Sequence, residues 1–245
     1  MKSINKKTIM FAVLSIWLVF LWWCANTQPK ESESVVTQDT TTEYTVDTSD
    51  ILDVNTLIDT ASTWGISDQE KVGLIQMREE EKLARDVYTT LGALWGNKLF
   101  TNIVASEQTH TDAVKWLLTM YGIADPVIDD TIGIFASSTM QKLYTDLVAQ
   151  WSTSLLDALI VGATIEDLDI KDLNVFIKET SNTNIINVYN NLNKWSRNHL
   201  RAYIKNINNN GGAYTPQYIS PSEYTAIISS QQERGSTWMG NRNGR

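Results

Sequence analysis

The sequence is poor in the residues that cross-link small exported proteins or interrupt helices. Its single cysteine, Cys24, excludes a disulfide within the chain, so the fold must depend on its core or on a bound metal. Only four prolines occur in 245 residues, and no stretch alternates apolar and polar positions as a half-buried strand does. Together with the abundance of helix-forming residues, these absences predict an all-α domain.

Basic residues and nucleotide-binding motifs are also scarce. The chain has 20 Lys and Arg against 28 Asp and Glu, a formal net charge of −8. Such an acidic surface argues against nucleic acid as a partner. No Gly-rich phosphate loop and no Cys-x-x-Cys pair is found.

The first 29 residues differ from the rest of the chain. Three lysines at positions 2, 6 and 7 precede the apolar run IMFAVLSIWLVFLWW. Basic residues followed by an apolar run indicate a signal peptide or a membrane anchor, with the remaining chain on the extracytoplasmic side. Cys24 directly follows this run, as the lipidated cysteine of bacterial lipoproteins does, although Trp22 and Trp23 stand where small residues are usual. Cleavage, lipid anchoring and a retained anchor stay open.

The rest of the chain divides into three parts by composition. Residues 30–50 are rich in Ser, Thr, Asp and Glu and read as a disordered linker. Residues 51–232 carry the helical periodicity and form the predicted domain. Residues 233–245 have no pattern and are predicted to be a disordered tail.

Four long helices are predicted within that domain, at about 68–95, 99–122, 154–179 and 184–209. Ser67-x-x-Glu70 forms a capping box before the first helix, and Gly96 ends it. The first two helices and the last two are joined by short turns, whereas residues 123–152 form a long crossover with one short helix from Ser138 to Trp151. Two helical hairpins joined by one crossover is the connectivity of ferritin-like four-helix bundles. After Gly212 we expect an extended arm packed on the bundle.

Each long helix carries polar residues in the middle of its apolar seam. The seam positions that hold acidic or imidazole side chains are Glu81, Glu107, His110, Glu166, Asp169 and His199. An antiparallel bundle brings the middles of its helices into one layer, so these groups should converge. Several buried carboxylates need compensation, because removing even one ionised carboxylate from water costs several kcal/mol. A metal ion provides it, and these six residues are the predicted ligands.

Other polar residues near this layer have weaker assignments. Tyr88 lies two turns after Glu81 on the same face and is interpreted as a core residue beside the ligands. Arg197 and Arg201 flank His199 and are either partners of the carboxylates or members of external salt bridges. Glu79 and Glu80 fall off the seam and are expected to be exposed.

The segments around these ligands resemble known proteins. Glu81-Lys-Leu-Ala-Arg-Asp-Val-Tyr88 and Ser106-Glu107-Gln-Thr-His110 are similar to the first two helices of rubrerythrin-like proteins, and Glu166-Asp-Leu-Asp169 to the third. The stretch from about Gly73 to Ile228 also resembles the DUF2202 family, an uncharacterised ferritin-like group. In dinuclear ferritin-like proteins the fourth helix carries Glu-x-x-His, but here Ser196 stands three residues before His199. The resemblance therefore implies a site that lacks one carboxylate, a deficit that Asp169 makes up in part.

Two functions follow from these observations. The first is a metal-binding protein with a mono- or dinuclear site, most suited to iron, with manganese and zinc as alternatives. Its chemistry would be reduction of dioxygen or peroxide, or oxidation of Fe(II). The second is a metal-free helical bundle that serves as an interaction or structural module of the cell envelope. The sequence does not decide between them, and it leaves the oligomeric state open.

Overall fold

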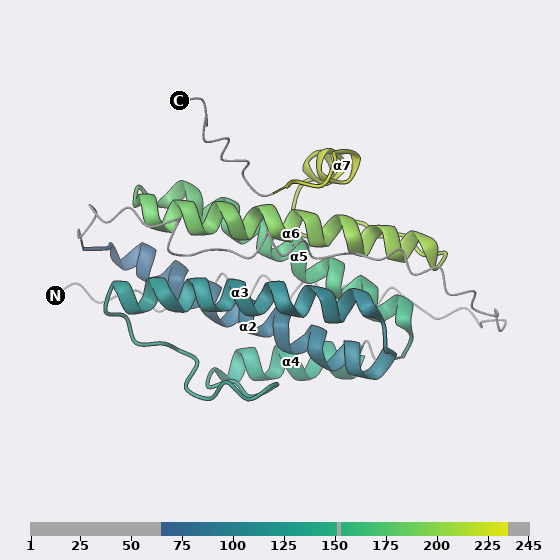
Figure 1. Ribbon diagram of the computed structural model, residues 1–245, viewed down its shortest axis with the longest axis horizontal. Helices are drawn as coiled ribbons and strands as arrows, with labels where there is room; N and C mark the ends of the chain where they lie inside the picture. The colour runs from purple at the N-terminus through teal and green to yellow at the C-terminus, as the bar shows by residue number, and fades with distance from the viewer. Residues whose placement is uncertain (1–64, 151–152, 235–245) are drawn as a thin grey trace, which may run out of the picture. The chain divides into compact units, whose positions relative to one another are not determined.

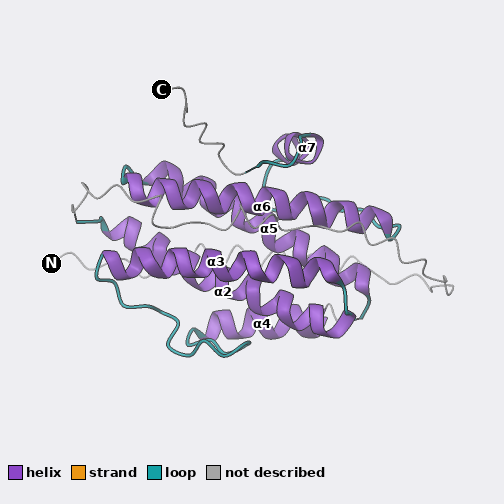
Figure 2. Cartoon of the chain, in the orientation of Figure 1, coloured by secondary structure: helices purple, strands orange, loops and turns teal. Residues whose placement is uncertain are grey.

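The computed structural model describes residues 65–150 and 153–234. These residues form six helices and no strand, which confirms the all-α prediction for this part of the chain (Figures 1 and 2). The helices are α2 (Asp68–Trp95), α3 (Lys98–Met120), α4 (Ser138–Gln150), α5 (Leu155–Glu179), α6 (Thr183–Asn209) and α7 (Pro221–Ser229).

Several predictions concern residues outside those ranges. The signal peptide or anchor at 1–29, the lipidation of Cys24, the linker at 30–50 and most of the tail at 233–245 fall there. Among the described residues, no helix combines the length and the apolar composition needed to cross a bilayer.

Capping residues mark the ends of the long helices α2 and α5. The Ser67 side chain accepts a hydrogen bond from the Glu70 N–H, and the Glu70 carboxylate accepts one from the Ser67 N–H, so the predicted capping box is present. Gly96 ends α2 with φ 60°, a left-handed conformation that glycine adopts without steric cost. Ser154 caps α5 by accepting from the Asp157 N–H.

The four long helices pack as two hairpins. α2 lies along α3 and α5 along α6, each pair joined by a short turn, and the hairpins meet where α2 contacts α5 and α3 contacts α6 (Figure 1). An apolar cluster fills one end of the space between them, with Leu74, Met77, Leu117, Leu173 and Leu192 among its members. At the other end, the aromatic rings of Tyr88, Phe100 and Tyr203 pack against one another.

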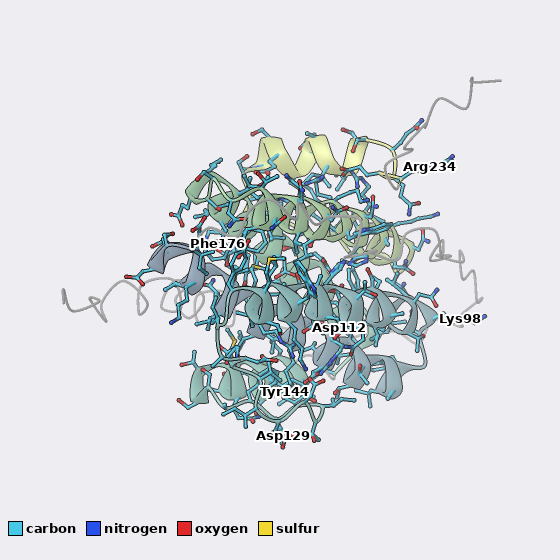
Figure 3. The ribbon with its side chains drawn as sticks, turned by 60° about the vertical axis from the view of Figure 1, so that its left-hand side comes forward. Lys98, Asp112, Asp129, Tyr144, Phe176 and Arg234 are labelled. Carbon is cyan, nitrogen blue, oxygen red and sulfur yellow. The ribbon has the colours of Figure 1, made fainter. Side chains whose placement is uncertain are left out.

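The connection from α3 to α5 crosses the outer face of α2. Its helix α4 packs on α2, and a partly buried ionic network connects α2 to the loop that precedes α4. Arg78 donates to Asp125, Arg85 donates to Asp130, and Lys82 donates to the Thr131 carbonyl. Asp129 and Tyr144 mark this side of the molecule in Figure 3. Because α2 contacts three other helices, it is buried on more faces than one apolar seam predicts.

The segment after Gly212 corrects the prediction of an extended arm. Only its first part is extended, and residues 221–229 form α7, which packs on α6. The Ser220 side chain accepts from the Glu223 N–H, and Pro221 occupies the first turn, where its missing N–H costs nothing. The predicted domain end at residue 232 falls just before Glu233, whose carboxylate pairs with Arg197 and Arg201.

Candidate metal centre

Five of the six predicted ligands come together between the long helices. They are Glu81 from α2, Glu107 and His110 from α3, Glu166 from α5 and His199 from α6, each no more than 1% exposed. Each lies near the middle of its helix, flanked by apolar residues of the same seam. The helical period thus carries these polar groups into one layer.

Glu107 lies at the centre of this group. Its Oε2 is 3.0 Å from His110 Nδ1, and its Oε1 is 2.9 Å from His199 Nδ1. One carboxylate therefore faces two imidazoles, one through each oxygen. The two rings lie roughly parallel, with their centroids 5.8 Å apart.

A further carboxylate completes each side. Glu81 Oε2 is 3.3 Å from His110 Nδ1, and Glu166 Oε1 is 3.5 Å from His199 Nδ1. Two groups result, Glu81–Glu107–His110 and Glu107–Glu166–His199, and within each group the donor atoms lie within 4.8 Å of one another. Because both contain Glu107, the arrangement suits one metal ion or two ions bridged by that carboxylate.

Burial and mutual charge shift the proton affinities of these groups. Burial raises the pKa values of Glu81 and Glu166 to about 7, even though His110 and His199 oppose the shift. Burial would lower the pKa values of the histidines, but the adjacent carboxylates raise His110 to about 10 and His199 to about 9. Burial would likewise raise the pKa of Glu107, but the two histidines hold it well below its usual range.

The donor set fits a divalent metal ion. Carboxylate oxygen and imidazole nitrogen are ligands for iron, manganese and zinc alike. Both oxygens of Glu81 are buried; Oε1 accepts no hydrogen bond from any described residue, and Oε2 has the 3.3 Å contact with His110 Nδ1. A buried acceptor such as Oε1 is costly without a donor or a cation, and a bound metal ion would meet it.

The remaining acidic ligand candidate, Asp169, lies beside the two groups rather than within them. It is 2% exposed, and burial together with the charges of Glu81 and Glu166 raises its pKa well above the usual range. Tyr88 is buried and donates a hydrogen bond of 2.8 Å to Glu166 Oε1, which orients this carboxylate. Tyr88 is therefore a core residue that also touches the centre.

The polar residues of α6 around His199 point to other partners. The Ser196 hydroxyl is buried and donates to the Leu192 carbonyl. Arg197 and Arg201 both donate to Glu233, which favours the external salt-bridge interpretation over contact with the central carboxylates.

Two features near the centre escaped the sequence analysis. Ser106 Oγ lies 3.3 Å from His110 Nε2, a contact that the spacing of four residues on α3 could have suggested. The expected exposure of Glu80 is wrong: this residue is 3% exposed, because the face of α2 next to the seam is covered by α5. Glu79 is partly buried.

Comparison with known proteins places the chain among uncharacterised relatives. An uncharacterised protein of Methanocaldococcus jannaschii, MJ0754, is 58% identical over 170 residues, which cover 69% of this chain and 92% of that protein. The crystal structure of the hypothetical protein MJ0754 matches with a TM-score of 0.70 at 55% identity, over 71% of this chain and 100% of the crystallised one. The family model described as an uncharacterised protein domain, DUF2202, matches residues 70–231. The chain therefore belongs to the DUF2202 family.

Proposed function

We propose that this protein is a ferritin-like, metal-binding four-helix bundle whose central layer holds iron, with manganese and zinc as alternative ions. The observation that carries the proposal is the pair of buried Glu–Glu–His groups that share Glu107. Two histidines that face opposite oxygens of one buried carboxylate are the arrangement expected where that carboxylate would lie between two metal ions. An ordinary salt bridge needs only one of the two histidines.

The arrangement of the helices supports the ferritin-like assignment. Two hairpins, α2–α3 and α5–α6, are joined by a long connection that contains α4, which is the connectivity expected for such bundles. The motifs that resemble rubrerythrin-like proteins supply Glu81, Glu107, His110 and Glu166 to the two groups.

The protein's own residues define how an ion would be held. Glu81 and His110 would bind on one side and Glu166 and His199 on the other, with Glu107 between them. Metal ligation requires deprotonated donors, so binding should release the protons that the high pKa values of the histidines imply. Bound iron would supply one-electron chemistry suited to reduction of dioxygen or peroxide, or to oxidation of Fe(II).

The proposal includes a location. The N-terminal apolar segment with its preceding lysines would place the domain on the extracytoplasmic side, anchored by that segment or by a lipid on Cys24. The membrane is then a partner through residues 1–29 only.

A metal-free module remains the second candidate, because one observation favours it. With both histidines protonated, Glu107 pairs with His110 and His199 at 3.0 and 2.9 Å, a partly neutralised core without any metal. In that state the bundle would serve as an interaction or structural module of the envelope.

Metal analysis of the full-length chain separates the two candidates. The chain is purified without a His tag in a non-ionic detergent, both aerobically and anaerobically, and is also incubated with Fe(II), Mn(II) or Zn(II) before desalting. The proposal expects about one to two tightly held equivalents per chain, the number that the two overlapping groups can bind. Metal content below about a tenth of an equivalent in every preparation would establish the metal-free module instead.

Two variants make the assignment specific. Glu107→Gln removes the carboxylate common to both groups and should abolish binding, whereas Glu79→Gln removes a neighbouring carboxylate outside them and should not. Equal metal content in the two variants would refute the proposed ligands.

A further inference from the structure

The seam between α2 and α5 has a definite register. At one end the Gln69 amide donates to Glu179 at 2.8 Å, and at the other the Tyr88 hydroxyl donates to the Gly162 carbonyl at 3.3 Å. The two helices are thus antiparallel over this whole length. The register between these contacts brings Glu80 of α2 opposite about residue 169 of α5, one helical turn from Asp172.

Two buried carboxylates in this register are not part of the candidate centre. Glu80 is 3% exposed and Asp172 is 5% exposed, although neither belongs to the two Glu–Glu–His groups. Each adjoins a residue of the central layer, since Glu80 precedes Glu81 and Asp172 lies one helical turn after Asp169. Glu80 and Asp172 therefore continue the central group of carboxylates along the contact between α2 and α5.

Asp172 lies at the end of this pair that reaches solvent through Lys171. Glu80 lies at the other end, and one of its oxygens has no hydrogen-bond partner among the described residues. Lys171 pairs with Asp172, and the Lys171 side chain is 38% exposed. Glu80 Oε1 accepts a hydrogen bond from the Gln76 amide at 2.8 Å. Glu80 Oε2 is buried and accepts none from any described residue. An acceptor of this kind is costly to bury alone.

Two tyrosine hydroxyls provide an independent indication of a missing ligand. Tyr189 is 1% exposed, and its hydroxyl has no hydrogen-bond partner among the described residues. It belongs to α6, and its hydroxyl lies 3.3 Å from where a Cβ on Gly73 of α2 would be, about two turns before Glu80. The Tyr218 hydroxyl is also buried without such a partner, and burial, followed by the charges of Asp167, Asp172 and Glu80, raises its pKa. Neither hydroxyl donates to these carboxylates.

Three other sides of the centre offer no unpaired carboxylate to a cation. Along the bundle axis, the apolar cluster blocks one end and the aromatic rings around Tyr88 block the other. On the outer face of α2, Arg78, Lys82 and Arg85 already occupy the neighbouring aspartates as ion-pair partners. The α2–α5 seam is the side of α2 on which buried carboxylates lead outward.

We propose that Glu80 and Asp172 form a transit site for a divalent cation that passes between solvent and the central layer. This inference rests on the proposed metal-binding function. Hard carboxylate oxygens suit Fe(II), Mn(II) and similar ions. Lys171 leaves Asp172 as the ion arrives, and the ion then replaces the missing partner of Glu80.

The test compares rates with affinity. Metal-free full-length chain in detergent is mixed with Co(II) in a stopped-flow spectrometer, and bound Co(II) is followed by its visible absorbance. Release is measured after mixing the loaded protein with excess chelator. The variants are Glu80→Gln, Asp172→Asn and the double variant, with Glu79→Gln as the control that loses the same charge next to the seam.

A transit site lowers the barrier in both directions. The double variant should take up and release Co(II) about tenfold more slowly, an effect in the range of electrostatic focusing, with the same Kd and stoichiometry. Asp172→Asn alone should slow both rates, and Glu79→Gln should change neither. Unchanged rates in the double variant, or equal slowing in the control, would overturn the transit site and leave the centre intact. Absence of Co(II) binding to the unmodified chain would overturn the proposed function as well.

Discussion

Metal removal should leave a protein whose stability falls as pH rises. The folded-state pKa values of Glu81 and Glu166 are about 7, above the ordinary 4.5, because burial disfavours their charged forms. The folded state therefore binds more protons than the unfolded state between these values. The stability associated with these protons is fully present below pH 4.5 and is lost as pH climbs through about 7.

The loss should be large compared with the total stability. A shift from 4.5 to about 7 corresponds to roughly 3 kcal/mol for each carboxylate, at about 1.4 kcal/mol per pKa unit. Stabilities of whole domains are about 5–15 kcal/mol. The histidines act in the same direction at higher pH, since the stability from their raised pKa values is present below 6.5 and is lost as pH passes about 9 and 10. The loss from one of these carboxylates alone, about 3 kcal/mol, should lower Tm by roughly 6–12 °C.

Thermal unfolding followed by circular dichroism between pH 5 and 9 measures this effect. The metal-free chain should show falling Tm, whereas the metal-loaded chain should show a smaller fall, because bound ions compensate the carboxylate charges. Replacing both Glu81 and Glu166 by Gln should flatten the metal-free profile. Constant or rising Tm of the metal-free chain from pH 5 to 8 would refute the reasoning.

Three further changes test individual parts of the fold and the centre. Ser196→Glu restores Glu-x-x-His on α6 and should convert a weak or absent second metal equivalent into a tight one; equal binding of two equivalents before the change would contradict this. Gly162→Ala places a Cβ 2.2 Å from the Tyr203 ring and should cost about 1–3 kcal/mol of unfolding free energy in denaturant titrations. Asp167→Asn weakens a buried carboxylate that accepts from the backbone N–H groups of residues 217–219, so limited proteolysis should cut that segment faster.

The parts of the fold that depend on local chemistry could be predicted from the sequence. The α2 boundaries follow from the Ser67 capping box and from Gly96, and both are present as expected. The convergence of five seam residues needed only the helical period and the antiparallel order of the hairpins. The start of α7 could also have been predicted, because Ser220-Pro221-Ser-Glu223 is a helix-initiation pattern.

The parts that depend on distant segments could not be predicted in the same way. One apolar period identifies one seam for each helix, but α2 packs against α3, α4 and α5, so Glu80 is buried on a second face. The partner of Arg197 and Arg201 is Glu233, more than 30 residues away in a segment without periodicity. Side chains at such contacts are chosen by tertiary packing, which a single-helix pattern does not contain.

The treatment of buried charge distinguishes the centre from the rest of the molecule. On the outer face of α2, each buried cation has an acidic partner: Arg78 pairs with Asp125, Lys82 with Asp86, and Arg85 with both Asp86 and Asp130. The chain thus compensates buried charge with side chains where it can. In the central layer, four carboxylates, including Asp169, accompany only two imidazoles, and Glu81 Oε1 lacks a hydrogen-bond donor among the described residues. Without a metal, at least two of these carboxylates must stay protonated to balance the layer, and at neutral pH this is the cost that a bound cation would remove.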